Sequence, residues 1–258
     1  MEWIWETILS ERVVLSLLIL ALASFIQATV GFAAALFGIP LLMWAGNDLI
    51  AAQVMIITAM LSQNLLSVWK LRHSIDYGEV VWPALIRVTA LPIGIAGLAM
   101  VMTWSAAGIN QLVGLIILLA VVMQAFVGIE WKTARRPHWL IITFGGSGVL
   151  QGLSGMSGPP MVLWVHGQRY STDRARAFLF AMYITNFFPQ MLLLWWQFGS
   201  SVLSAVIVAC LSLPAVLVGA MLGLRLGSRL GDRWLRPITY ACLIALAVRS
   251  LLQPLWAG

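Results

Sequence analysis

The stretch GLSGMSGPPMVLW, residues 152–164, lies inside an apolar region and decides how the whole chain is interpreted. It contains three glycines and two adjacent prolines. These are the two least favourable residue types in the interior of a helix. An apolar segment that interrupts its own helix in this way requires a specific reason, which the rest of the sequence supplies.

The composition indicates an integral membrane protein. Of the 258 residues, 61% are hydrophobic and 9% are charged, whereas a soluble domain carries about 25% charged residues. Apolar stretches close to the length of a membrane-spanning helix, about 20 residues, fall at 13–33, 50–69, 80–103, 111–128, 139–165, 177–196, 202–224 and 237–253. We therefore expect an all-α polytopic membrane protein in a lipid bilayer.

The net charge of +6 indicates orientation and no nucleic-acid partner. Most of the 15 lysine and arginine residues fall in four short loops, near 70–72, 132–136, 169–176 and 225–236. This clustering is typical of the cytoplasmic loops of membrane proteins. The two cysteines, Cys210 and Cys242, are far apart in apolar stretches and predict neither a metal site nor a disulfide. The sequence contains no nucleotide-binding loop, and we expect no cofactor.

The two halves of the sequence share a pattern. Residues 26–44 resemble residues 150–164, and LPIGIAG at 91–97 resembles LPAVLVG at 213–219. The corresponding residues are Gln27 with Gln151, Gly31 with Gly155, Pro40 with Pro160, and Asn64 with Asn186. Several matches in the same order predict an internal duplication.

The charge pattern predicts how the halves are related. If every apolar stretch crossed the membrane once, basic loops would lie on both sides. The conflict disappears if the stretch at 139–165 enters the membrane and returns on the same side. By the repeat, the stretch at 13–44 should do the same. We predict two inverted repeats, each a broken or re-entrant helical hairpin plus three transmembrane helices, at 1–128 and 139–258. A basic cytoplasmic linker at 129–138 joins them, and both termini lie outside. Inverted repeats are a common plan of secondary transporters.

The two breaks predict a binding site. Irregular backbone at membrane depth is tolerated only where protein or a water-filled cavity satisfies it. We expect short helices to open at Pro40 and Pro160, with N-terminal amides that attract an anion at a midplane site between the hairpin tips. Neutral polar side chains nearby donate hydrogen bonds without the cost of a buried charge. The predicted substrate-binding residues are Gln27, Thr29, Gly31, Pro40, Asn64, Gln151, Ser154, Gly155, Ser157, Gly158, Pro160 and Asn186.

Two further features are not explained by the breaks. Arg87 lies within an apolar stretch, and its repeat counterpart is Ala209, so the charge is not duplicated. It can serve as a substrate counter-ion or extend to the membrane surface, and we favour the second interpretation. Glycines at 219, 223, 227 and 231 form one flat face, which packs either within the chain or across a homodimer.

The paired motifs GFAAALFGIP, residues 31–40, and GLSGMSGPP, residues 152–160, resemble those of the TauE/SafE sulfite exporter family of membrane transporters. The resemblance covers nearly the whole chain. It implies transport of sulfite or an organosulfonate such as sulfoacetate across the bacterial cytoplasmic membrane. The residues themselves indicate only a small anion.

Two other functions are compatible with parts of the sequence. Ser154 and Ser157 each fit the G-x-S-G pattern of rhomboid proteases, but the three histidines lie in or beside the basic loops, where none can activate a buried serine. An anion channel would need a continuous polar lining, whereas the polar residues cluster at the breaks. We therefore expect a transporter and no enzyme, with the coupling ion, proton or sodium, left open.

Overall fold

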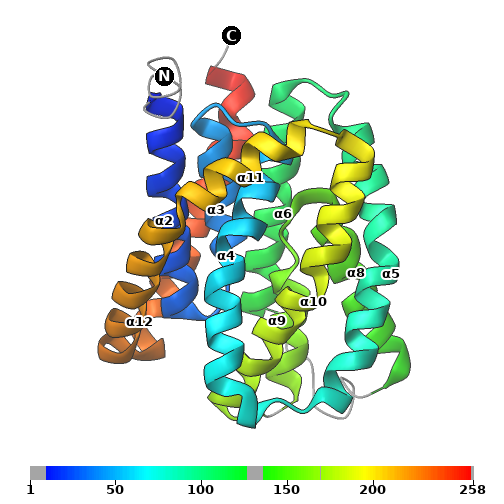
Figure 1. Cartoon of the computed structure of the whole chain (residues 1–258), viewed down its shortest axis with the longest axis vertical. Coiled ribbons are helices and arrows are strands. Elements are labelled where there is room, and N and C mark those ends of the chain that lie inside the picture. Colours follow the sequence, from blue (N-terminus) through cyan, green and yellow to red (C-terminus); the bar gives the residue numbers. More distant parts are fainter. Residues whose placement is uncertain (1–9, 127–135, 169, 257–258) are drawn as a thin grey trace. The chain divides into compact units, whose positions relative to one another are not determined.

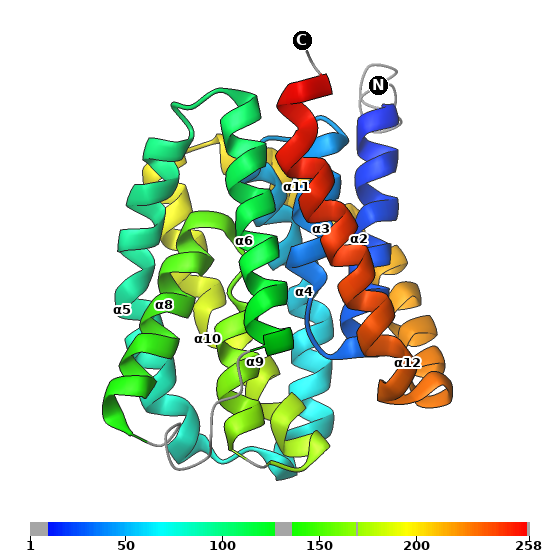
Figure 2. The ribbon, with the colours of Figure 1, turned by 180° about the vertical axis from the view of Figure 1, so that it is seen from behind.

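The chain folds into helices. A computed structural model describes residues 10–126, 136–168 and 170–256, and among them it contains no strand. The predicted all-α class is confirmed. Figures 1 and 2 show the elements, which are α2 (Glu11–Val30), α3 (Ala34–Trp44), α4 (Leu49–Leu71), η1 (Arg72–Ser74), α5 (Tyr77–Val101), α6 (Ala106–Phe126), α8 (Pro137–Ser154), α9 (Gly158–Gly167), α10 (Thr172–Phe198), α11 (Ser201–Leu211) and α12 (Leu213–Trp256).

The helices are long and apolar enough for a multi-pass membrane protein. Five candidate spans correspond to α2, α4, α5, α6 and α10, and a sixth is formed by α11 with the first part of α12. That pair bends by 54°, because Pro214 has no backbone N–H to continue the preceding helix. The apolar stretch at 139–165 is divided into α8 and α9. Most of the predicted linker at 129–138 lies outside the described residues.

Polar and apolar side chains are distributed as a membrane requires. Large apolar side chains on the described surface include Phe188, 74% exposed, and Trp196, 81% exposed. Polar side chains such as Gln53 and Gln190 are fully buried. A water-soluble protein shows the opposite preference, so the exposed apolar surface is suited to lipid.

The chain divides into two compact units. The first comprises residues 1–63 and 198–242, and the second comprises residues 64–197 and 243–258. These units do not coincide with the sequence halves, and the division into repeats at 1–128 and 139–258 stays a prediction.

In the first unit, α2 and α3 form a helical hairpin, with α3 running back beside α2 (Figure 1). The first part of α12 packs against α2 through two glycines. A Cβ atom on Gly219 would lie 2.3 Å from the carbonyl oxygen of Ala21, and one on Gly223 would lie 2.4 Å from that of Phe25. These two members of the predicted glycine face therefore pack within the chain. Residues 227 and 231 lie outside the described side chains.

In the second unit, α5 and α8 are packed backbone to backbone. A Cβ atom on Gly94 would lie 2.2 Å from the carbonyl oxygen of Val149, and one on Gly148 would lie 2.3 Å from that of Arg87. Gly152 makes an equally close approach to α5. Only glycine permits such an approach. As a result, the middle of α5 lies directly against α8, just before the break that leads into α9.

Candidate functional site

Both hairpins turn at a glycine in the left-handed conformation. Gly31, with φ 88°, ends α2 and donates its N–H to the carbonyl of Gln27 at 2.8 Å. Gly155, with φ 73°, ends α8 and donates to the carbonyl of Gln151 at 2.9 Å. Both are the common glycine ending of a helix, and the same residues correspond in the sequence repeat. The matching caps support a duplication, while the inverted relation of the halves stays a prediction.

The helices that follow the two turns begin differently. α9 begins at Gly158 and has Pro160 in its first turn, as predicted. α3 begins at Ala34, and Pro40 lies inside it. The prediction that Pro40 opens this helix is wrong, because the alanines before it are strong helix formers and start the helix earlier.

The prolines also change what the start of α9 offers to an anion. Residues 159 and 160 are both proline and have no backbone N–H. Two donors of the first helical turn are therefore missing, and α9 is a weaker anion site than a regular helix N-terminus. In α3, residues 34–36 are not proline and keep their N–H groups. The two hairpins thus differ in the donors that they present.

A buried arginine lies where α9 lacks donors. The Arg87 side chain on α5 is 0% exposed, so the prediction that it extends to the membrane surface is wrong. Its Nη1 donates to the carbonyl of Met182 at 2.6 Å. Its Nη2 donates to Gln151 Oε1 at 3.0 Å and to Ser157 Oγ at 2.5 Å. The guanidinium group therefore joins α5, the α8–α9 break and α10.

The predicted polar residues of the second break position this arginine. Ser157 donates its hydroxyl hydrogen to Gln151 Oε1 and accepts from Arg87. The side-chain amide of Gln151 donates to Gln190 Oε1 at 2.7 Å, and Gln190 Nε2 donates back to the Gln151 carbonyl at 3.1 Å. Ser147 donates to the carbonyl of Ser157 at 3.0 Å. Because these groups satisfy one another, the network fixes the direction of the guanidinium group.

The charge of Arg87 has no carboxylate partner among the described residues. All of its hydrogen-bond partners are neutral, and its Nε has none. Tyr183 adds a ring face, with its centroid 5.9 Å from the guanidinium carbon. The salt bridges of the described chain instead join Arg174 to Asp76 and Glu79, near the start of α5 and α10. A buried charge without a counter-ion is costly, so this site is suited to an anionic ligand.

Asn186 on α10 is the other incompletely bonded group of this region. Its side chain is 1% exposed, and neither Nδ2 nor Oδ1 has a hydrogen-bond partner in the described part of the chain. Its repeat counterpart Asn64 is also buried, at 6% exposure. Buried polar atoms normally have partners, so the free amide of Asn186 is a candidate contact for a ligand.

The remaining predicted residues lie near the breaks and bond locally. Thr29 donates its hydroxyl hydrogen to carbonyls of its own helix, those of Phe25 and Ile26. Ser154 does the same to the carbonyl of Leu150 at 3.0 Å. Gln27 is buried, at 5% exposure. Hydroxyls that bond back to their own helix end or bend it, so Thr29 and Ser154 shape the turns.

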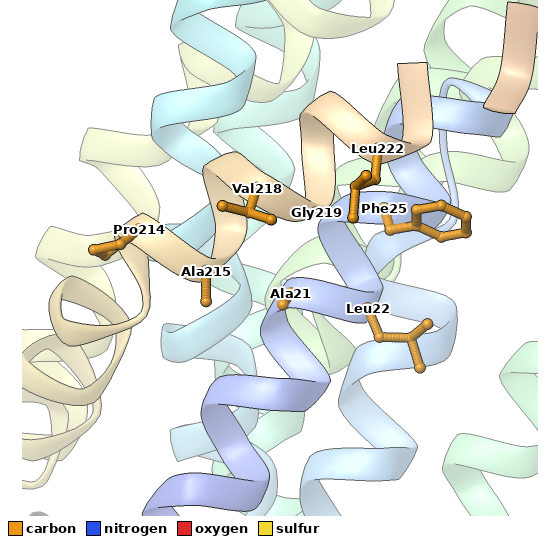
Figure 3. Close-up of a pocket in the computed structure, with 8 residues that line it drawn as sticks. All are labelled: Ala21, Leu22, Phe25, Pro214, Ala215, Val218, Gly219 and Leu222. Atoms are coloured by element: carbon orange, nitrogen blue, oxygen red, sulfur yellow. The ribbon is translucent and has the colours of Figure 1, made fainter. Parts of the chain in front are cut away.

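A cavity of about 460 Å³ lies in the first unit between α2 and the first part of α12 (Figure 3). Its lining residues are apolar and comprise Ala21, Leu22, Phe25, Pro214, Ala215, Val218, Gly219 and Leu222. It offers no hydrogen-bond donor from a polar side chain and is unsuited to an anion.

Comparison with known proteins identifies the family. The family model for the sulfite exporter TauE/SafE matches residues 16–250 of the 258 residues. The chain belongs to the TauE/SafE family. No curated protein and no solved structure matches it at a significant level. As a TauE/SafE protein it is a multi-pass membrane transporter for a small anion, and it is not an enzyme.

The structure agrees with the exclusion of a serine protease in this TauE/SafE chain. Ser154 and Ser157 are buried and bonded to a helix carbonyl and to the arginine network. The three histidines at 73, 138 and 166 are exposed. A serine nucleophile needs a base within hydrogen-bond reach.

Sequence reasoning underestimated Arg87 and missed Gln190 and the glycines that hold α5 against α8. One signal was available, because Gly148 and Gly152 form the G-x-x-x-G spacing of closely packed membrane helices. Another was the unduplicated charge itself, since an ionisable residue within a membrane segment is a functional candidate by default. Gln190 gave no signal, because its role depends on contacts with a distant helix.

Proposed function

We propose that the protein is a secondary carrier that binds its anion at the Arg87 guanidinium group and moves it by alternating access. The observation that carries the proposal is a positive charge that is fully buried and bonded only to neutral groups. Opposite charge in a low-dielectric site contributes about 4 kcal/mol at 4 Å with an effective dielectric constant near 20. A small anion would therefore be held much more strongly here than by neutral donors alone.

Several groups support an oxyanion as the ligand. The free Nε of Arg87 and the free Nδ2 of Asn186 are donors, and oxyanions accept several hydrogen bonds at once. Ser157 and Gln151 orient the arginine. We propose that Gln27, Gly31 and Asn64 take part from the other half, on the basis of the sequence repeat.

Family membership and the placement of charge support the proposed substrate, orientation and membrane. The family description, sulfite exporter, favours sulfite or an organosulfonate such as sulfoacetate. The basic loops favour insertion into the bacterial cytoplasmic membrane with those loops inside and both termini outside. A proton or sodium gradient would drive transport, and neither a homodimer nor a particular coupling ion is favoured by a specific contact.

The test is flux into proteoliposomes. Sulfite, sulfoacetate, taurine, sulfate and acetate are offered in turn to the wild-type protein, to Arg87→Gln and to Arg72→Gln, in which an exposed arginine is replaced as a control. We expect saturable uptake and counterflow of a sulfur oxyanion in the wild type and in the control, with loss in Arg87→Gln. Equal uptake in all three proteins would exclude Arg87 from the site. Non-saturable flux without counterflow would indicate an anion channel.

A further inference from the structure

The side chain of Asn186 limits which hydrogen-bonding groups the ligand has, and the charge of Arg87 does not. Arg87 and its donors require only an acceptor. The side chain of Asn186 has both a donor, Nδ2, and an acceptor, Oδ1, and both atoms are buried without a partner among the described residues. An inorganic dianion such as sulfate can accept from Nδ2, but it has no hydrogen to give to Oδ1.

Asn186 lies on α10 between two residues that contact the arginine network. On α10, Asn186 lies one helical turn after Met182 and one turn before Gln190. Met182 accepts from Arg87, and Gln190 bonds to Gln151. Residues four apart share one face of a helix. Asn186 therefore lies on α10 between the main-chain carbonyl that accepts from Arg87 and the side chain that bonds to Gln151 at the α8–α9 break.

The helix at this point also offers a second acceptor. Pro189 lies inside α10 and has no N–H for the carbonyl of Thr185, the residue before Asn186. An acceptor that is buried without a donor is costly, and a ligand that donates there removes the cost. The polar groups therefore match a ligand with both acceptor atoms and at least one N–H or O–H.

The charge of the ligand is limited as well. Among the residues whose side chains the structure describes, Arg87 is the only fully buried Asp, Glu, Lys or Arg. A monoanion would neutralise it, whereas a dianion would leave one uncompensated negative charge in the interior. Burying such a charge costs several kcal/mol.

We infer that the site selects a small monovalent oxyanion that carries its own hydrogen-bond donor, which bonds to Asn186 Oδ1. The inference rests on the proposed function, because it assumes that the anion binds at Arg87. Sulfoacetate, a dianion without a donor hydrogen at neutral pH, does not have this chemistry, and two other kinds of ligand do. One is a protonated inorganic oxyanion such as hydrogensulfite, and the other is an organosulfonate with a hydroxyl or amino group.

The experiment compares isosteric ligands in proteoliposomes. The probes are 2-hydroxyethanesulfonate, 1-propanesulfonate, which has a methyl group in place of the hydroxyl, and sulfate. Hydrogensulfite is tested as a competitor at mildly acidic pH. We expect the hydroxyl compound or hydrogensulfite to be preferred over 1-propanesulfonate about 10- to 100-fold in half-saturation, because the latter leaves Oδ1 unpaired. The stronger of the two ligands identifies the kind of donor. Sulfate should be the weakest.

A matched pair of variants assigns the preference to one residue. Asn186→Leu keeps the size of the side chain and removes its polar atoms, so the preference should fall to about onefold while 1-propanesulfonate binds as before or better. Asn110→Leu, which replaces a buried asparagine on α6, should keep the full preference. Thermal unfolding of both variants checks that they are folded.

The flux results distinguish a failure of this inference from a failure of the proposed function. Flux that depends on Arg87 but is equal for all monoanions, or strongest for sulfate, would overturn the inference and leave the proposed function intact. The same holds if Asn186→Leu keeps the full preference, because water rather than the ligand would then satisfy Oδ1. Flux that is unaffected by Arg87→Gln would overturn the proposed function itself.

Discussion

Replacing Arg87 with methionine should separate stability from transport. Methionine matches the unbranched stem of arginine as far as Nε, has no charge, and packs adaptably in irregular spaces. A buried ion costs several kcal/mol in lost hydration. Three hydrogen bonds to neutral acceptors return about 1.5–3 kcal/mol each. The two contributions nearly cancel, so the charge contributes little net stability to the ligand-free protein.

The hydrogen-bond partners of Arg87 determine whether Arg87→Met raises or lowers the free energy of unfolding. The carbonyl of Met182 keeps the hydroxyl of Thr185 as a donor, at 3.0 Å. Gln151 Oε1 keeps Ser157, which donates its hydroxyl hydrogen to it. Removal of the guanidinium group therefore leaves the Met182 carbonyl and Gln151 Oε1 with a donor, and Ser157 Oγ loses the bond it accepts but keeps the one it donates. We expect Arg87→Met to change the free energy of unfolding by less than about 2 kcal/mol, with an increase favoured.

The anion affinity of Arg87→Met, unlike its stability, should fall strongly. Loss of a Coulomb interaction of about 4 kcal/mol lowers anion affinity about 1,000-fold. At a ligand concentration 100 times its Kd, the wild type should gain about 2.7 kcal/mol of stability, and the variant should gain almost none. Tryptophan fluorescence during thermal unfolding in detergent measures both effects. A variant that unfolds far below the wild type and still shows the full ligand-induced shift would refute the reasoning, because Arg87 would then be a structural tie.

Three further predictions concern the packing around this site. Gly148→Ala places a Cβ atom 2.3 Å from a carbonyl of α5. This substitution should lower the free energy of unfolding by about 1–3 kcal/mol in the same assay. The control Gly146→Ala, whose Cβ atom would have no atom within 4 Å, should be neutral or stabilising. Gly155→Ala puts a residue with a side chain at φ 73° and should lower the free energy of unfolding by about 1–2 kcal/mol. An unchanged midpoint of thermal unfolding would show that the turn relaxes. Arg174→Gln removes a partly exposed salt bridge and should cost under about 1 kcal/mol, less at high salt, in chemical denaturation; a larger loss would show that this pair acts as a buried tie.

The linear pattern of residues determined the class of the protein and the place of its breaks. Helical spans follow from runs of apolar residues, because in lipid the backbone must satisfy its own hydrogen bonds. The turns at Gly31 and Gly155 follow from the local preference of glycine for positive φ, here 88° and 73°. Such features depend on neighbouring residues and can be predicted without a fold.

Tertiary structure decided which polar groups act together. The sequence shows Arg87 only as an isolated charge in an apolar helix, and the interpretation that it reaches the membrane surface was reasonable on that basis. Its burial depends on glycines of α8 that admit α5 at close range and on acceptors from α8, the break and α10. Likewise, the side chains of Gln151 and Ser157 bond to the protein, while that of Asn186 has no hydrogen-bond partner among the described residues. The three residues look equivalent in sequence, because hydrogen-bond satisfaction is a property of distant segments brought together and leaves no local pattern.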